Sequence, residues 1–293
     1  MGDRPHRGLP VTILITGANG NVGWCVTALL AHRRPRVMVR GPHEFPSGVD
    51  IRYGDFDYPE TWPEVLDGVH SVYLYPFAGA DFVAAARKAG VRRFVVHSAA
   101  AAGFTIDYDG TALARHLAEE RDGHRAVETA VEASGAEWTH LRPGLLATNT
   151  LGWAEAIRTE RVVREPYPGS GYPLVHEADI AEIAVAALLT DEHVGAAYTL
   201  TGPAKVTQAE QVAAIGAAVG AEIGFEELTP EQAVGKWRGE NWPEEDMQWH
   251  VELLADAVDG PGSLPVSGTF EKLTGRLPRS FAQWARDHAA DFS

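Results

Sequence analysis

The chain has 293 residues, of which 45% are hydrophobic and 22% are charged, as is usual for a folded globular protein. Its formal net charge of −15 disfavours a nucleic-acid partner, because an acidic surface repels phosphate backbones. The single cysteine, Cys25, excludes an internal disulfide and a multi-cysteine metal centre. No signal region and no apolar stretch of ~20 residues is evident, so we expect a cytoplasmic protein without a membrane partner.

Short β-branched runs alternate with helical patterns along the first half of the chain. We expect strands at residues 11–16, 36–40, 49–53, 69–75, 92–98 and 137–142. This alternation predicts βαβ units, and the nearly continuous apolar strands predict a sheet with helices on both faces. The predicted fold class is therefore α/β, a doubly wound parallel sheet of the Rossmann type.

The second half of the chain is less regular, with an irregular stretch rich in proline and glycine before a further helical pattern and strand. We expect residues 9–144 and 175–202 to form a dinucleotide-binding domain. Residues 145–174 and 203–293 are then expected to form a smaller, C-terminal substrate-binding lobe.

Residues 15–23 read ITGANGNVG and lie between a predicted strand and a predicted helix, which is the context of a dinucleotide fingerprint. Gly17 permits a tight turn, Gly20 leaves room for a diphosphate, and Gly23 lets the helix pack closely on the sheet. Free backbone amides and the helix dipole would then face the phosphates. The alternative is a glycine-rich turn without a ligand. The predicted phosphate-binding residues are Gly17, Asn19, Gly20, Asn21, Val22 and Gly23.

The spacing G-x-x-G-x-x-G differs from the usual Rossmann spacing G-x-G-x-x-G. Together with further blocks, it resembles the NmrA-like family of atypical short-chain dehydrogenases/reductases, over nearly the whole chain. The blocks are ILITGANGNVG, GDFDYPETW, VRRFVVHSAA, HRAVETAVEASGAEWTHLRPG, VHEADIAEIAVAAL, YTLTGP and FEKLTGRLPRSFAQWARDH. The resemblance implies an NAD(P)-binding protein similar to quinone and azo reductases, in a family that also contains non-catalytic sensors.

The end of the second predicted strand bears on the choice of cofactor. That strand ends at Arg40, with Arg33, Arg34 and Arg36 before it and no acidic residue until Glu44. An acidic residue here would bind the ribose of NAD, whereas an arginine accommodates the 2′-phosphate of NADP. We therefore expect NADP, as NADPH, rather than NAD. The alternative is that these arginines are solvated surface residues.

Residues at the ends of the later strands are further candidates, because ligands of open α/β sheets bind outside the carboxyl ends of the strands. The resemblance implies that Asp55 and Phe56 flank the adenine, with an Asx turn as the alternative for Asp55. Tyr75 and Phe77 are expected along the cofactor, with packing under the loop as their alternative. The remaining predicted cofactor residues are Pro76, Ser98, Ala99, Pro143 and Gly144.

Classical members of the superfamily use a Tyr-x-x-x-Lys pair to protonate a carbonyl oxygen, and this sequence contains no such pair. In the matching helix, His124 takes the place of the lysine and Glu120 that of the tyrosine. A quinone-like acceptor gives a stabilised phenolate that needs little proton help. We therefore expect a small aromatic or quinone-like acceptor. His124 and Tyr108 are the candidate catalytic residues; His124 would donate a proton or bind a cofactor ribose hydroxyl, with a structural role as its alternative.

The predicted substrate lobe is rich in tryptophan and tyrosine, which suits a flat hydrophobic substrate, with the lobe's own core as the alternative. Asn149, Trp153 and His176 are the candidate substrate residues, and the histidine spacing predicts no metal site. Three functions remain open: an NAD(P)H-dependent oxidoreductase, which we favour, a non-catalytic NAD(P) sensor that binds a partner protein, and a redox-neutral isomerase or dehydratase. A homodimer is compatible with the sequence.

Overall fold

The computed structural model describes residues 12–106, 109–259 and 264–293. Contacts divide the chain into two compact units. Unit 1 comprises the described part of Met1–Ser98 with Arg125–Leu141 and Ala181–Ala197, and unit 2 comprises Ala99–His124, Arg142–Ile180 and Tyr198–Ser293. These bounds differ from the residue limits that we expected for a dinucleotide-binding domain and a substrate-binding lobe. The division into those two functional parts stays a prediction.

A seven-stranded sheet has the strand order β3-β2-β1-β4-β5-β6-β9. The strands are β1 (Thr12–Thr16), β2 (Arg36–Val39), β3 (Asp50–Tyr53), β4 (Val69–Leu74), β5 (Arg93–His97), β6 (Glu137–Pro143) and β9 (Ala196–Leu200). The five pairs from β3 to β6 are parallel. The strand order reverses between β1 and β4, and the crevice at such a switch point is where these sheets bind ligands. The predicted α/β Rossmann-type fold is confirmed.

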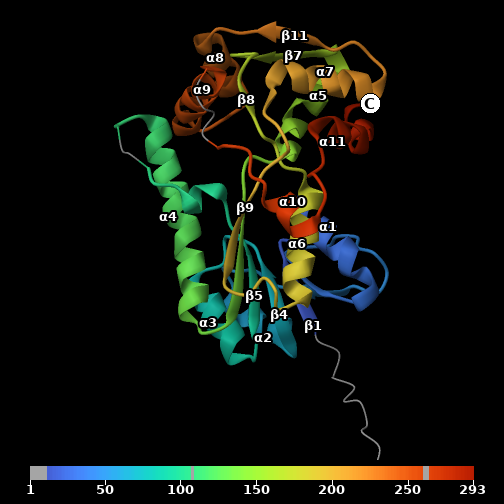
Figure 1. The fold of residues 1–293 in the computed structure, drawn as a ribbon, viewed down its shortest axis with the longest axis vertical. Coiled ribbons are helices and arrows are strands. Elements are labelled where there is room, and N and C mark those ends of the chain that lie inside the picture. The colour runs from blue at the N-terminus through green and yellow to red at the C-terminus, as the bar shows by residue number, and fades with distance from the viewer. Residues whose placement is uncertain (1–11, 107–108, 260–263) are drawn as a thin grey trace, which may run out of the picture. The chain divides into compact units, whose positions relative to one another are not determined.

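Helices cover both faces of this sheet (Figure 1). α2 (Trp62–Leu66) and α3 (Ala80–Lys88) lie on one face, and α1 (Asn21–Leu30) and α6 (Glu177–Leu189) lie on the other. Residues of α4 (Ala112–Ala133) join the core on the α2 and α3 side. Short 3-10 helices follow α1 at Ala31–Arg33, precede α2 at Pro59–Thr61 and follow β5 at Ala100–Gly103.

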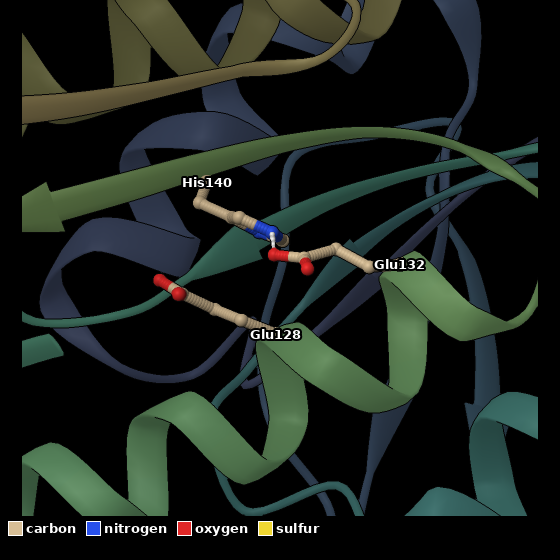
Figure 2. Close-up of side chains that lie close together, drawn as sticks. All are labelled: Glu128, Glu132 and His140. Atoms are coloured by element: carbon tan, nitrogen blue, oxygen red, sulfur yellow. Dashed lines mark hydrogen bonds and ion pairs between the residues drawn. The ribbon is translucent and has the colours of Figure 1, made fainter.

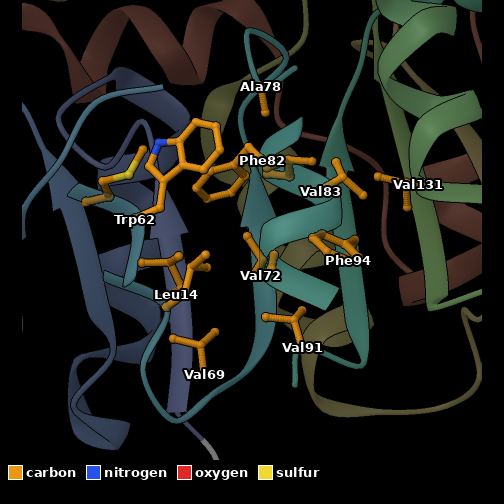
Figure 3. Close-up of a cluster of buried hydrophobic side chains, with 14 of the residues drawn as sticks. Leu14, Trp62, Val69, Val72, Ala78, Phe82, Val83, Val91, Phe94 and Val131 are labelled. Atoms are coloured by element: carbon orange, nitrogen blue, oxygen red, sulfur yellow. The ribbon is translucent and has the colours of Figure 1, made fainter. Parts of the chain in front are cut away.

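The core of unit 1 fills the space between the sheet and α2, α3 and α4 (Figure 3). Leu14, Val72 and Phe94 come from three strands and meet Phe82 of α3, whose ring lies edge-on to Trp62 at 5.3 Å between centroids. Burial of each such large apolar side chain stabilises the fold by about 1.5–3 kcal/mol. This well-packed layer therefore fixes the ends of the strands. The predicted ligand residues lie at the edge that these strand ends form.

Unit 2 contains small sheets that the sequence patterns did not predict: β7 pairs with β11 in parallel, and β8 pairs with β10 antiparallel. None of the helices in the described part of the chain is long and apolar enough to cross a membrane. The further elements are the 3-10 helix η4 (Ala147–Trp153), α5 (Ala154–Glu160), β7 (Val162–Glu165), β8 (Gly171–Tyr172), β10 (Val206–Thr207), α7 (Gln208–Val219), β11 (Gly224–Glu227), α8 (Pro230–Gly239), α9 (Glu244–Asp259), α10 (Thr269–Thr274), α11 (Phe281–Asp287) and the 3-10 helix η5 (Ala289–Phe292).

Candidate nucleotide site

Glycines shape the turn between β1 and α1, but for different reasons. Gly17 has a φ of +64°, and a Cβ there would lie 2.9 Å from the ring of Tyr75. A Cβ at Gly23 would overlap the carbonyl oxygen of Gly17, so only glycine lets α1 approach the turn. Gly20 has an ordinary φ of −85°, and a Cβ there would meet only the Gly17 oxygen, at 3.4 Å. The fold therefore tolerates a side chain at Gly20, and its absence keeps the surface of the turn bare.

The first turn of α1 has no side-chain cap. Gly20 is the N-cap residue, no hydrogen bond from a side chain caps the helix, and the first turn contains no acidic residue. The first amides of a helix have no partner within it, which here applies to Asn21, Val22 and Gly23. Combined with the positive end of the helix dipole, they form a site suited to an anion such as a diphosphate.

Thr16, which was not singled out from the sequence, joins the carboxyl ends of β1 and β4. Its hydroxyl donates to the carbonyl oxygen of Tyr73 at 3.0 Å and accepts from the amide of Tyr75 at 2.8 Å. The Tyr75 ring packs under Gly17 and lies edge-on to Phe77 at 5.2 Å. Tyr75 therefore packs under the turn, which was the alternative to a cofactor contact. Phe77, at the same edge of the sheet, is 76% exposed.

Ser98 follows β5 and has an unusual environment. It is 1% exposed, and its amide donates to the carbonyl oxygen of Leu141 at 2.7 Å. Its hydroxyl has no hydrogen-bond partner among the described residues. A buried polar group without a partner costs about 1–3 kcal/mol. Such a group at the carboxyl end of a strand fits a polar ligand that binds along this edge.

His97, the residue before Ser98, forms a buried pair with Tyr73 of β4, and the sequence patterns did not reveal this pair. The Tyr73 hydroxyl and His97 Nδ1 are 2.5 Å apart. Burial raises the pKa of Tyr73 well above its usual value, so the phenol keeps its proton. The only local signal was a histidine within the apolar run RFVVHS.

The arginines around β2 separate into different roles. Arg40 is exposed directly after β2 and has no ion-pair partner among the residues that the structure describes. Arg36 is buried at the start of the strand, where it pairs with Asp50 at 2.8 Å and donates to the carbonyl oxygens of Val65 and Asp67 at 2.9 and 2.7 Å. Arg36 therefore has a structural role, and Arg40 is the arginine at the carboxyl end.

The loop after β3 also contacts its own unit. Asp55 Oδ1 accepts a hydrogen bond from the amide of Asp57 at 3.2 Å, which is the Asx turn named as the alternative. The Phe56 ring lies edge-on to Phe82 at 4.9 Å and packs against the core. Their predicted contact with an adenine stays a prediction.

The other candidate residues belong to unit 2, except Tyr108, which lies outside the described residues. Ala99 begins the first segment of unit 2. Gly144 follows the buried Pro143, the last residue of β6, and donates its amide to the carbonyl oxygen of Leu200 at 2.9 Å. His124 is half-buried on α4. These residues belong to unit 2, whereas the turn after β1 belongs to unit 1. Their proposed contacts with the cofactor therefore stay predictions.

The three predicted substrate residues have different surroundings within unit 2. Asn149 is exposed on η4. Trp153 lies beside the carboxylate of Glu165, where it opposes the rise in pKa that burial causes, and it packs against the core. His176 is only 4% exposed, and its Nδ1 accepts from the Ala178 amide at 3.1 Å. These contacts favour a structural role for Trp153 and His176 and leave Asn149 open to a ligand.

One cluster has the residue types of a metal site (Figure 2). Glu128 and Glu132 lie one turn apart on α4 and point toward His140 of β6, with one ligand atom from each residue within 4.8 Å of the others. Arg125 pairs with both carboxylates, and Glu132 lies 3.0 Å from His140 Nε2. Since the guanidinium already supplies a positive charge, we interpret the cluster as an ion-pair network that fastens α4 to β6.

The bare turn, the uncapped helix and the arginine after β2, on a doubly wound sheet, define a dinucleotide-binding protein of the Rossmann type. Residues 17–191 match the protein family described as NAD(P)H-binding. The chain belongs to this NAD(P)H-binding family, and the predicted resemblance to atypical short-chain dehydrogenases/reductases is confirmed.

Two relatives cover nearly the whole chain. One is the (4-alkanoyl-5-oxo-2,5-dihydrofuran-3-yl)methyl phosphate reductase of Streptomyces griseus, 33% identical over 297 residues, with 96% of this chain and 99% of the relative covered. Another is the NAD(P)H azoreductase of Xenophilus azovorans, 32% identical over 294 residues, with 96% and 99% covered.

Solved structures show the same fold. Citrobacter triphenylmethane reductase complexed with NADP(H) has a TM-score of 0.73 at 21% identity, with 95% of this chain and 100% of that chain covered. The NADPH-dependent quinone oxidoreductase of Escherichia coli complexed with NADPH has a TM-score of 0.72 at 22% identity, with 94% and 99% covered.

Proposed function

We propose that the protein is an NADPH-dependent reductase that transfers hydride to a small aromatic or quinone-like acceptor. The observation that carries this proposal is the turn after β1, where Gly20 stays bare although the fold tolerates a side chain there. The relatives support the same function, because the two described above, at 33% and 32% identity, are both named as reductases.

The residues present fit the cofactor. When bound, NADPH would supply the hydride for the reduction. In unit 1, the first amides of α1 bind the diphosphate, and Arg40 binds the 2′-phosphate. The bound cofactor gives the Ser98 hydroxyl a hydrogen-bond partner, which this hydroxyl lacks among the described residues. The other residues that we propose to border the cofactor are Asn19, Asp55, Phe56, Tyr75, Pro76, Phe77, Ala99, Pro143 and Gly144.

His124 holds a proton for the reduced acceptor or binds a ribose hydroxyl, and Tyr108 is the second proposed donor. Asn149, Trp153 and His176 are the proposed substrate residues, of which Asn149 is the exposed one. A quinone-like acceptor suits this set, because its reduced form is a stabilised anion that demands little from a proton donor. A cytoplasmic location and a homodimer also stay predictions.

The test is oxidation of NADPH by a panel of quinones and azo dyes, followed at the absorbance band of the reduced nicotinamide. We expect turnover with at least one acceptor, and a slower rate with NADPH deuterated at the nicotinamide C4. Tight binding of both cofactor redox forms without turnover on any acceptor would contradict the proposal and favour the sensor. Product formation without net loss of NADPH would favour a redox-neutral reaction.

The role of His124 has a separate test. We expect His124→Ala to lower turnover or cofactor affinity several-fold, a modest loss because a stabilised anion demands little from a proton donor. Thr129→Ala, at an exposed position on the same helix, is the matched control and leaves both unchanged. Unchanged turnover and affinity in His124→Ala would assign this histidine a structural role.

A further inference from the structure

β3 is an edge strand of the seven-stranded sheet, and no strand in the described part of the chain pairs with its outer side. The amide of Asp50 donates to the carbonyl oxygen of Pro35 at 2.9 Å, at the start of the parallel ladder with β2. Bonding residues alternate along a parallel ladder, so Ile51 and Tyr53 direct their amide and carbonyl groups away from β2. The outer side therefore presents donors and acceptors with which another strand can pair.

The side chains of β3 separate apolar groups from charged ones. Ile51 and Tyr53 lie on one face of the strand and are 38% and 62% exposed. Asp50 and Arg52 lie on the other face, where they pair with each other at 3.0 Å, and Arg52 also pairs with Glu64 of α2 at 2.8 Å. Charged side chains usually protect an edge strand from other strands. Here the charges are paired with one another, and the apolar face of the edge carries none.

We infer that β3 pairs antiparallel with β3 of a second copy of this chain, with Ile51 opposite Ile51 at a two-fold axis. Each Ile51 amide then donates to the Ile51 carbonyl oxygen of the other copy, and each Tyr53 amide donates to the carbonyl oxygen of Val49. The two sheets join edge to edge through the same surface of both copies. This pairing involves none of the residues that we propose to bind the cofactor or the acceptor, so it goes beyond the proposed function.

Both faces of β3 favour this register over the neighbouring ones. Residues directly opposite each other in an antiparallel pair lie on the same face and contact each other. In the proposed register Tyr53 meets Val49 of the second copy, which is a favourable aromatic and β-branched pair, and Asp50 meets Arg52. Moving the axis one residue back would place Asp50 opposite Asp50, and moving it one residue on would place Arg52 opposite Arg52. Like charges directly opposite each other destabilise a strand pair.

The charges at this contact differ from the charge of the whole chain. The formal net charge of −15 makes two copies repel each other at long range, but physiological salt screens charges more than about 8 Å apart. Asp50 and Arg52 form the closely spaced, non-hydrogen-bonded pairs of the proposed ladder, with Cα atoms about 4.5 Å apart. The complementary charges therefore act at a distance where the long-range repulsion is screened.

Sedimentation equilibrium over a dilution series tests the inference. We expect the wild type to exchange between a one-chain and a two-chain species. For Ile51→Lys we expect the dimer dissociation constant to rise about fivefold or more, because two ammonium groups then meet at the axis. Val194→Lys is the matched control, since Val194 is a β-branched residue of similar exposure, 41%, before β9 at the opposite edge of the sheet. Both variants should keep the thermal midpoint and the NADPH affinity of the wild type.

Cysteine cross-linking in a Cys25→Ser background tests the register. Ile51→Cys places two cysteines opposite each other with Cα atoms about 5.5 Å apart, which a disulfide can span. We expect Ile51→Cys to form two-chain disulfides under mild oxidation. Tyr53→Cys should form none, because its counterpart lies four residues, about 13 Å, further along the strand.

A one-chain species throughout the dilution series overturns the inference, whether the edge then stays in water or pairs with a different chain. A dimer that Ile51→Lys leaves as strong as in the wild type also overturns it, because the copies then meet through another surface. Disulfides from Tyr53→Cys without disulfides from Ile51→Cys contradict the register. NADPH binding by the wild type is measured separately and tests only the proposed function.

Discussion

The nucleotide edge of unit 1 and the start of α6 in unit 2 differ in how their polar side chains are paired. At the nucleotide edge of unit 1, the Ser98 hydroxyl and Arg40 have no partner among the described residues. At the start of α6 in unit 2, the buried carboxylate of Glu177 lies 2.8 Å from His288 Nε2, and Asp179 accepts from the Arg279 amide at 2.8 Å. Buried atoms without a hydrogen-bond partner also occur among the described residues of unit 2, Ser170 Oγ and Glu177 Oε2 among them. We therefore infer a ligand at Ser98 from its place at the carboxyl end of β5 as well as from its missing partner.

The pKa values in unit 2 express this pairing. Burial on its own would raise the pKa of Glu177, but the imidazoles of His176 and His288 outweigh it and lower that pKa to about 2. The hydrogen bond with Glu177 in turn raises the pKa of His288. The network therefore holds its charges by mutual contact, as a structural site does.

The largest expected effect comes from breaking the paired network. Glu177→Ala leaves His288 with one carboxylate fewer, and we expect a loss of about 3 kcal/mol in the free energy of unfolding. For a chain of 293 residues, this lowers the thermal midpoint by roughly 5 °C. NADPH affinity below the midpoint stays unchanged. Glu192→Ala, at an exposed position, is the control, and a loss as small as that control's would contradict a structural network.

A smaller effect is expected at the bare turn. Gly20→Ala adds a methyl group that the fold accommodates but a bound diphosphate meets. We expect at least tenfold weaker NADPH binding, about 1.4 kcal/mol, with an unchanged thermal midpoint. Gly235→Ala on α8, where a Cβ meets nothing within 4 Å, is the matched control. Equal NADPH affinity in Gly20→Ala and wild type would show that the diphosphate does not lie against this turn.

Ser98→Ala should give two effects of opposite sign. Removing a buried hydroxyl without a partner raises the stability of the cofactor-free protein by about 1 kcal/mol. Losing a hydrogen bond to the cofactor weakens NADPH binding about fivefold. Ser71→Ala, which removes a buried serine whose hydroxyl lies 3.0 Å from His70 Nδ1, should destabilise the protein and spare NADPH binding. If Ser98→Ala destabilises the protein and spares NADPH binding, as Ser71→Ala is expected to do, the Ser98 hydroxyl does not bind the cofactor.

The smallest expected effect is on the pH dependence of stability. The folded-state pKa of Glu177 is lowered from 4.5 to about 2, so its contribution is present above pH 4.5 and is lost as the pH falls toward 2. The pKa of His288 is raised from 6.5, so its contribution is present below pH 6.5 and is lost as the pH rises through the raised value. The stability difference between wild type and His288→Asn, about 1 kcal/mol at most, is therefore expected to be widest between pH 4.5 and 6.5. Thermal midpoints measured from pH 3 to pH 9 check this, and a difference that does not vary with pH would contradict it.

Local patterns were enough to predict the parts of the fold that local chemistry determines. The strands from β1 to β6 begin or end within a residue or two of their predicted limits, and the glycines at 17 and 23 have the close contacts that the motif requires. Contacts between distant segments were not predictable in this way. In the sequence, Arg36 was counted among the arginines that favour NADP, with a solvated position as the alternative, and only the structure shows it enclosed by Asp50 and the end of α2. His43 reads as a surface histidine until Trp24 is placed beside it.

Backbone amide resonances recorded during an NADPH titration test the central claim most directly. If the first turn of α1 binds the diphosphate, the largest shifts will occur at the amides of Gly20, Asn21, Val22 and Gly23. The amides of α8 in unit 2, where no residue is proposed to bind cofactor or substrate, will serve as the unperturbed reference. Binding of NADPH without shifts at these four amides, or no binding of any nicotinamide dinucleotide, would contradict the account.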